Sequence, residues 1–127
     1  MHDCIELFTG ERKMCAKDQV QELLNAISAI YSDVYGASVD QVILYGSYAR
    51  GDEKEDSDLD IVAIVHGNRE QLQKDLYKVW EASGELELEY DTILSPTVIP
   101  YDEFQKYRND LPYYRNIATE GVRVNAR

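Results

Sequence analysis

The sequence predicts a single small α/β domain in which a mixed β-sheet is flanked by helices. Three observations predict this fold class. The chain has 127 residues, enough for one domain and too few for two ordinary ones. Apolar residues make up 44% of it, an ordinary fraction for a globular protein. Segments with the period of a strand alternate along the chain with segments that have the period of a helix.

The N-terminal part divides into an extension and a first helix. Residues 1–17 show no clear period, so we expect an N-terminal extension there and the domain itself in residues 18–127. From Asp18, apolar residues recur at intervals of three and four, which predicts an amphipathic helix that ends at Gly36 and packs on the sheet. Cys4 and Cys15, both in the extension, have no metal-ligand spacing and are expected to be free thiols.

A short strand over residues 41–45 leads into a glycine turn. Gly46 allows the backbone to turn sharply and to approach a ligand closely. Ser47 then begins a helical turn whose free N–H groups can hold a phosphate. The sequence therefore predicts a phosphate site at the end of this strand.

Two carboxylates stand at the start of the next strand, which we expect over residues 59–65 after an acidic loop at residues 52–56. Because side chains alternate along a strand, Asp58 and Asp60 point to the same face. Two acids side by side repel each other unless a cation lies between them, and oxygen ligands of this kind suit Mg²⁺ or Mn²⁺. The loop acids are expected to be solvated.

The second half of the chain predicts a further helix and strand. Residues 68–83 have helical periodicity, and Gly84 is expected to end this helix. A third strand is expected within residues 85–95, because the residues around Asp91 favour a strand. The order strand, helix, strand implies a crossover and hence a parallel or mixed sheet.

The C-terminal third predicts two short helices and a last short strand. The helices begin near Pro100 and Pro112, Gly121 ends the second, and the strand covers residues 122–124. This region is rich in tyrosine, which fits either a protein-binding surface or a cover for the edge of the core. His66, alone at a strand end, is expected to be incidental.

The spacing of the two motifs resembles a known signature. Gly46-Ser47, ten intervening residues and then Asp58-Leu59-Asp60 resemble the signature of the DNA polymerase beta nucleotidyltransferase superfamily. The chain looks most like its minimal nucleotidyltransferase (MNT) branch, over residues 18–124.

The resemblance implies a polymerase-beta-type fold and roles for individual residues. Asp58, Asp60 and Asp91 would be catalytic and would hold two Mg²⁺ ions. The family requires a third carboxylate on the neighbouring strand, for which Asp91 is the candidate and Glu89 the alternative. Gly46 and Ser47 would hold the phosphates of ATP. Arg50 would contact phosphate or brace the acidic loop.

The resemblance also implies a partner. MNT proteins of this size resemble antitoxins of HEPN ribonuclease toxins, which implies AMP transfer from ATP to a tyrosine of the toxin. The formal net charge of -11 fits a basic protein partner and disfavours nucleic acid. No apolar run is long enough to cross a membrane and no secretory signal is evident, so we expect a cytoplasmic protein.

Two alternatives stay open. The chain could bind a partner without catalysis and carry a residual metal site, or it could transfer a nucleotide to a small cationic substrate such as an aminoglycoside. Chains of the latter kind resemble longer proteins with an added substrate-binding part. The sequence does not disclose the acceptor, the preferred nucleotide or whether the chain forms a homo-oligomer.

Overall fold

The structure is a computed structural model that describes residues 17–51 and 58–124. The predictions for the two cysteines, for the extension before Lys17 and for the acidic loop lie outside these residues.

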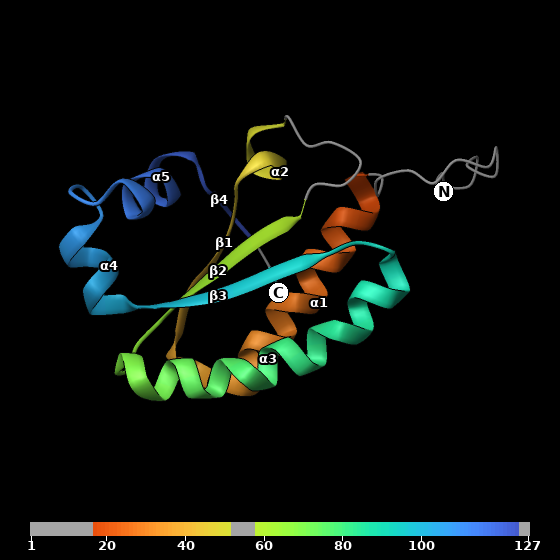
Figure 1. The fold of residues 1–127 in the computed structure, drawn as a ribbon, viewed down its shortest axis with the longest axis horizontal. Helices are drawn as coiled ribbons and strands as arrows, with labels where there is room; N and C mark the ends of the chain where they lie inside the picture. The colour runs from red at the N-terminus through yellow and green to blue at the C-terminus, as the bar shows by residue number, and fades with distance from the viewer. Residues whose placement is uncertain (1–16, 52–57, 125–127) are drawn as a thin grey trace.

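The described residues form a four-stranded sheet with helices on both faces (Figure 1). In chain order the elements are α1 (Lys17–Tyr35), η2 (Gly36–Ser38), β1 (Val39–Tyr45), α2 (Ser47–Arg50), β2 (Leu59–Val65), α3 (Arg69–Tyr90), β3 (Leu94–Pro100), α4 (Tyr101–Tyr107), α5 (Pro112–Glu120) and β4 (Val122–Arg123). The predicted fold class is therefore confirmed.

The sheet is mixed, with the order β3-β2-β1-β4. β1 is antiparallel to both β2 and β4, whereas β2 and β3 are parallel because α3 connects them as a crossover. β1 therefore ends at the same edge of the sheet at which β2 and β3 begin. This edge, called the rim below, carries the predicted site.

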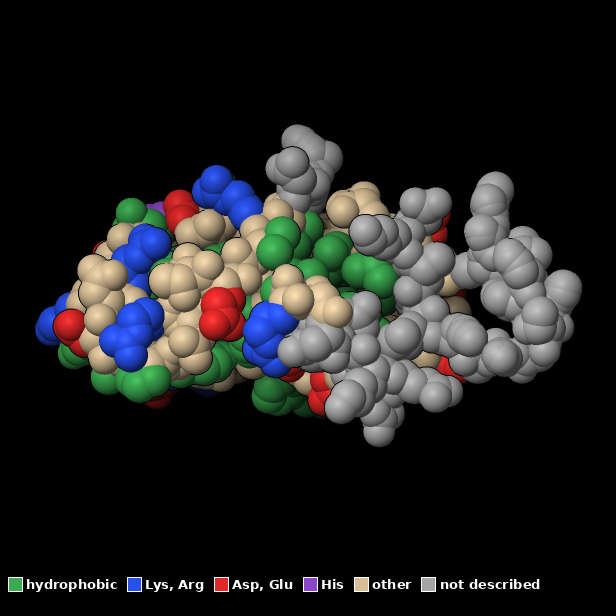
Figure 2. All heavy atoms as spheres, turned by 90° about the horizontal axis from the view of Figure 1, so that it is seen from above, with side chains coloured by type: hydrophobic (Ala, Val, Ile, Leu, Met, Phe, Trp, Pro, Cys, Tyr) green, Lys and Arg blue, Asp and Glu red, His purple; other side chains and the backbone are tan. Residues whose placement is uncertain are grey.

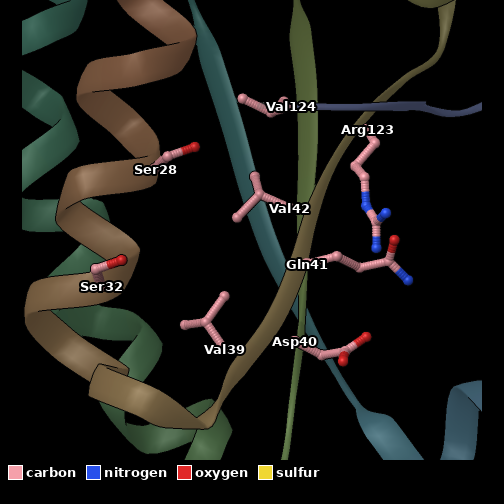
Figure 3. A pocket seen from close by; sticks show the side chains of 8 residues that line it. All are labelled: Ser28, Ser32, Val39, Asp40, Gln41, Val42, Arg123 and Val124. Carbon is pink, nitrogen blue, oxygen red and sulfur yellow. The ribbon is translucent and has the colours of Figure 1, made fainter. Parts of the chain in front are cut away.

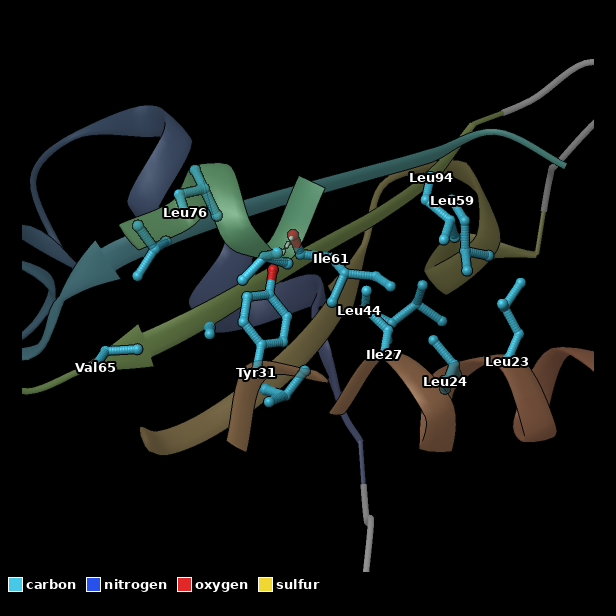
Figure 4. Packing of buried hydrophobic residues seen from close by; sticks show 14 of the residues in the cluster. Leu23, Leu24, Ile27, Tyr31, Leu44, Leu59, Ile61, Val65, Leu76 and Leu94 are labelled. Atoms are coloured by element: carbon cyan, nitrogen blue, oxygen red, sulfur yellow. Dashed lines mark hydrogen bonds between the residues drawn. The ribbon is translucent and has the colours of Figure 1, made fainter. Parts of the chain in front are cut away.

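The strands alternate between two apolar layers. The larger cluster lies between the sheet and helices α1 and α3, and Figure 4 shows its side chains converging from the helix α1 and the strands. The smaller cluster lies under α4 and α5 on the opposite face. Because Asp60 alternates with the buried Leu59 and Ile61, its side chain belongs to the α4–α5 face.

Tyr31 fixes α1 to the middle of the sheet. Its ring is fully buried, and its hydroxyl donates a hydrogen bond of 2.7 Å to the carbonyl oxygen of Thr97 on β3. Burial raises the pKa of this hydroxyl well above its ordinary value. The contact is structural, since it lies on the face of the sheet opposite Asp60.

The prediction that Gly84 ends the third helix is wrong. α3 continues to Tyr90, because Leu86 and Tyr90 extend the face already formed by Leu72, Leu76 and Val79 and pack on the same cluster. The third strand consequently begins at Leu94, later than predicted. A strand that includes Pro96 and Pro100 is tolerated here because β3 lies at the sheet edge.

Candidate active site

The rim brings together three segments that are distant in the sequence. The end of β1 supplies Gly46, the start of β2 supplies Asp58 and Asp60, and the start of β3 supplies Ser95. Tyr45 pairs with Asp60 across the β1–β2 ladder, and Ser95 pairs with Asp60 across the β2–β3 ladder. The structure thus juxtaposes the glycine turn and the two carboxylates.

Gly46 is in contact with Asp60 and has a conformation that glycine tolerates best. Its φ is +81°, and a methyl group in place of its hydrogen would overlap the Asp60 carboxylate. The carbonyl oxygen of Gly46 accepts hydrogen bonds of 3.1 Å from the N–H groups of Ala49 and Arg50, which closes the predicted helical turn α2. The backbone therefore approaches the carboxylate as closely as a residue without a side chain permits.

The surroundings of Asp60 disfavour its ionised form. Burial raises the pKa of the Asp60 carboxyl, the negative charge of Asp58 raises it further, and Arg50 lowers it. Asp58 is exposed at the rim, and the Ser95 hydroxyl lies 3.5 Å from the Oδ2 atom of Asp58. A cation bound between the carboxylates would relieve both the burial penalty and the repulsion.

Arg50 is the cation that α2 brings to the rim. Its guanidinium lies 3.8 Å from the carboxylate of Glu120, at the end of α5, and both side chains are about half exposed. An exposed pair at this distance contributes little to stability. The pair with Glu120 therefore adds little to the energy that holds Arg50 near the site.

Sequence reasoning did not identify a tyrosine pair beside the carboxylates. The hydroxyls of Tyr45 and Tyr113 are 3.0 Å apart, and their rings meet edge to face with centroids at 6.0 Å. Burial, the hydrogen bond with Tyr113 and the charge of Asp60 raise the pKa of Tyr45. The alternation of β1 could have indicated Tyr45, because it shares a face with Ile43, but Tyr113 comes from α5 and depends on tertiary packing.

Asp91 is not in a strand, contrary to the prediction. It caps the C-terminal end of α3 in the left-handed conformation, with φ +53°, and lies three positions before β3. Glu89, the alternative, lies on α3 and is exposed. The β3 residue beside Asp60 is Ser95, so the strand position expected for a third carboxylate carries a hydroxyl.

The residues present fit one magnesium ion bound together with a phosphate. Asp58 and Asp60 offer hard oxygen ligands, and Gly46 leaves room beside the Asp60 carboxylate. Within residues 17–51 and 58–124, no group of three or more His, Cys, Asp or Glu side chains could hold a metal. Mg²⁺ is commonly bound by one or two carboxylates with substrate phosphates completing its coordination, and Asp58 and Asp60 provide two carboxylates of this kind.

The comparison with protein families identifies the fold. The sequence profile described as a nucleotidyltransferase domain matches residues 20–125, which include the glycine turn, both carboxylates and every strand. The chain belongs to the nucleotidyltransferase domain family. The predicted superfamily resemblance is thereby confirmed.

Two relatives of this nucleotidyltransferase domain come from Methanocaldococcus jannaschii. "Putative protein adenylyltransferase MJ0141" is 35% identical over 79 residues, which cover 62% of this chain and 74% of that protein. "Putative protein adenylyltransferase MJ0604" is 30% identical over 102 residues, which cover 80% and 90%. Among solved structures, a toxin-antitoxin crystallised with AMP-PNP has a TM-score of 0.51 and 17% identity over 82% of this chain and 73% of its own. The last similarity concerns the fold.

A hollow lies away from the rim. It has a volume of about 290 Å³ and lies where α1 approaches β1 and the end of β4 (Figure 3). Ser28 and Ser32 line it from α1, and Asp40 and Arg123 line it from the two strands. None of these residues adjoins the carboxylate pair in the β-ladders, so this hollow is separate from the candidate active site.

The α4–α5 end differs in charge from the chain as a whole. Seen from above, both basic and acidic side chains lie over the end of the molecule that α4 and α5 form (Figure 2). Residues 101–120 carry three Lys or Arg and four Asp or Glu, so this end is close to neutral although the chain has a formal net charge of -11. His66 stacks on Tyr101 with ring centroids 4.2 Å apart, at the opposite end of β2 from the carboxylates, which agrees with the prediction that it is incidental.

None of the described helices is both long and apolar enough to cross a membrane.

Proposed function

We propose that the chain transfers AMP from ATP to a tyrosine hydroxyl of a partner protein, with Mg²⁺, and that the partner is a HEPN ribonuclease toxin which it neutralises. The observation that carries the proposal is the interacting pair Asp58 and Asp60 at the start of β2, with the Asp60 carboxylate against the Gly46 turn. Two relatives that bear the name protein adenylyltransferase support AMP as the transferred group. A toxin-antitoxin of the same fold, crystallised with AMP-PNP, supports a toxin as the partner.

Each residue of the rim has a role in this reaction. Asp58 and Asp60 would hold the metal, which when bound neutralises charge on the phosphates and favours in-line attack. The backbone at Gly46 and Ser47 would position the outer phosphates, because it forms the start of the helical turn α2 and Gly46 lies against the Asp60 carboxylate. Arg50 would exchange its pairing with Glu120 for the phosphates.

The transfer forms one bond and breaks one bond. The acceptor oxygen bonds to the α-phosphorus, the bond from the α-phosphorus to the bridging oxygen breaks, and pyrophosphate leaves. The hydroxyl proton passes to a carboxylate of the site or to water. Asp91 remains a predicted third ligand and proton acceptor, although it would have to act from the end of α3.

The second candidate function is binding without catalysis. It is favoured by Ser95, since this residue occupies the β3 position beside Asp60 that a third carboxylate would need. In that case the chain would grip its partner and the two carboxylates would be a residual metal site.

Intact-mass analysis separates the two functions. A purified HEPN ribonuclease, sought as the product of the neighbouring gene, is incubated with the chain, ATP and Mg²⁺, and a gain of one or more adenylate units is expected. Asp58→Asn and Asp60→Asn should each reduce the rate about 10²-fold or more, whereas the exposed α4 variant Asp102→Asn should not. A stable complex with no change of mass, and with toxin neutralised equally by the Asp58→Asn/Asp60→Asn protein, would establish the binding function instead.

Asp91→Asn and Ser95→Ala test the third position. If Asp91 is a ligand, Asp91→Asn should reduce the rate as much as Asp60→Asn. If Ser95 supports Asp58 through its hydroxyl, Ser95→Ala should raise the Mg²⁺ concentration needed for half-maximal rate by severalfold. Asn is chosen at position 91 because it tolerates the left-handed conformation.

A further inference from the structure

The outward face of α3 carries an apolar stripe that the described part of the chain does not cover. It consists of Tyr77, Trp80, Gly84 and Leu88, hereafter the α3 stripe. The three side chains are 59%, 51% and 86% exposed, respectively. The spacing of three, seven and eleven residues from Tyr77 places the four on adjacent turns of one side of the helix. That side is turned by roughly 120° from Leu72, Leu76 and Val79, which face the core. Trp80 lies at the edge of the stripe nearer the sheet, where its indole donates to the carbonyl of Pro96.

Gly84 is unexplained by packing within the described residues. A glycine inside a helix destabilises it by roughly 0.5–1 kcal/mol relative to alanine. A methyl group at this position would meet nothing within 4 Å, and the backbone here is ordinary helix. The glycine instead leaves a depression on the stripe between Trp80 and Leu88, which a side chain from outside can fill.

Charged residues on one flank of the stripe are segregated by sign. Lys74 and Lys78 precede the middle of the stripe, and Glu85 and Glu89 follow it; all four are exposed. At 100° per residue these four positions fall on the same flank of the helix. The flank is therefore positive in one half and negative in the other.

We infer that the α3 stripe binds the α3 stripe of a second copy of this chain, with the two helices antiparallel. In an antiparallel pair the same flanks of the two helices meet, so Lys78 would face Glu85 of the second copy, and Lys74 would face Glu89 of the second copy. Lys78 lies 3.7 Å from Asp75 of its own helix, an exposed pair of little energetic weight that it would share with Glu85 of the second copy. In a parallel pair opposite flanks meet, so the charged flank of one copy would not face that of the other and this complementarity would be lost. The segregation of charge thus makes the surface complementary to itself.

The same register places the stripe residues in contact. Tyr77 would insert among four residues of the second copy, spaced as a hole on a helix surface: Glu81, Gly84, Glu85 and Leu88. Gly84 makes this hole deep enough for an aromatic ring. Glu81, beside the stripe, would lie near Glu81 of the second copy. The two like charges would repel each other and oppose the association.

The adjacent sheet edge is a poor alternative for a partner. The β3 edge lacks N–H groups at Pro96 and Pro100, the indole of Trp80 donates a bond of 2.9 Å to the carbonyl of Pro96, and the N–H of Leu94 donates to Glu87 at 2.8 Å. These contacts block strand addition. Since α3 lies on the face of the sheet opposite Asp60, pairing of two α3 helices leaves the candidate active site open.

Sedimentation or light scattering of the full chain, without nucleotide or partner, tests this inference. Over a roughly hundredfold concentration series, the mass should rise from that of one chain to that of two. Leu88→Asp should abolish the rise, and Lys78→Glu or Glu85→Lys alone should weaken self-association roughly tenfold. The double variant Lys78→Glu/Glu85→Lys should restore it, and Glu81→Gln should strengthen it.

Matched controls keep the result interpretable. Glu22→Lys, on the exposed side of α1, makes the same change of charge as Glu85→Lys and should leave self-association unchanged. Thermal midpoints show whether each variant is folded. A chain that stays single at all concentrations, or that dimerises equally well with Leu88→Asp, would overturn the inference, as would a failure of the double swap to restore pairing. Because no nucleotide is present, this outcome is independent of the proposed transfer activity.

Discussion

Burial and the neighbouring charge of Asp58 both disfavour the ionised form of Asp60, although a metal ligand must be ionised. Its folded pKa is raised, so the folded protein binds more protons than the unfolded one between the unfolded pKa of about 3.9 and the folded pKa. The resulting loss of stability begins as pH rises through the lower value and is complete above the higher one. The ionised form of Asp60, which a metal site needs, therefore lowers the stability of the folded protein.

Replacement of Asp60 should reveal this conflict as opposite changes. Asp60→Asn is expected to raise the thermal midpoint of the metal-free protein near neutral pH (about 7), to change it little near pH 3, and to abolish transfer. Melting curves at the two pH values and the mass assay measure both effects. An equal effect of Asp60→Asn on stability at both pH values would show that ionisation is not its cause.

Gly46 should be more sensitive to substitution than glycines with similar backbone conformations. Gly46→Ala combines a positive φ with an overlap on the Asp60 carboxylate, so we expect a loss of about 2–4 kcal/mol in unfolding free energy and a large loss of transfer. Gly36→Ala has a positive φ and open space, and should cost about 1 kcal/mol with transfer retained. Denaturant titration measures both. Equal costs at the two positions would contradict the role given to the contact with Asp60.

At the scale of elements, the tyrosines of α1 test how the helix is held. Tyr31 is fully buried and bonds to the carbonyl of Thr97, whereas Tyr35 is half-buried and bonds to the carbonyl of Leu72, each at 2.7 Å. Tyr31→Phe removes the hydroxyl that donates to the carbonyl of Thr97. It should lower the free energy of unfolding by about 1–2 kcal/mol. Tyr35→Phe should cost roughly half as much, because water can reach its site. Denaturant titration that ranks them in reverse order would contradict this account.

The elements also show what the sequence could predict. α1, β1, β2 and the α2 turn were predictable because each has a clear period with a glycine or a charged segment at its end. The boundary of α3 was not, since Gly84 was interpreted as a stop while Leu86 and Tyr90 still followed the helical period. Tertiary burial overrides the weak preference of a single glycine. The strand position of Asp91 was consequently wrong, whereas Gly46 and the two carboxylates were found by local spacing alone.

At the scale of the whole molecule, the formal net charge of -11 bears on how a partner arrives. An acidic protein attracts a basic one over distances comparable to the Debye length, which is about 10 Å at 0.1 M salt and shorter at higher salt. Such attraction changes the association rate far more than the dissociation rate. Residues 101–120, at the α4–α5 end, carry three Lys or Arg and four Asp or Glu, so most of the negative charge lies elsewhere in the chain and the field is not uniform (Figure 2).

Salt should therefore slow association with a basic toxin. Between about 50 mM and about 500 mM salt we expect the association rate constant to fall roughly tenfold to a hundredfold, with a smaller change in dissociation. Surface-binding kinetics measure both rates, and a chelator in all samples separates the effect of ionic strength from that of bound Mg²⁺. An association rate that does not depend on salt would mean that apolar contacts alone bring the two proteins together. The acidic surface would then serve solubility, which is the commoner role of such a surface.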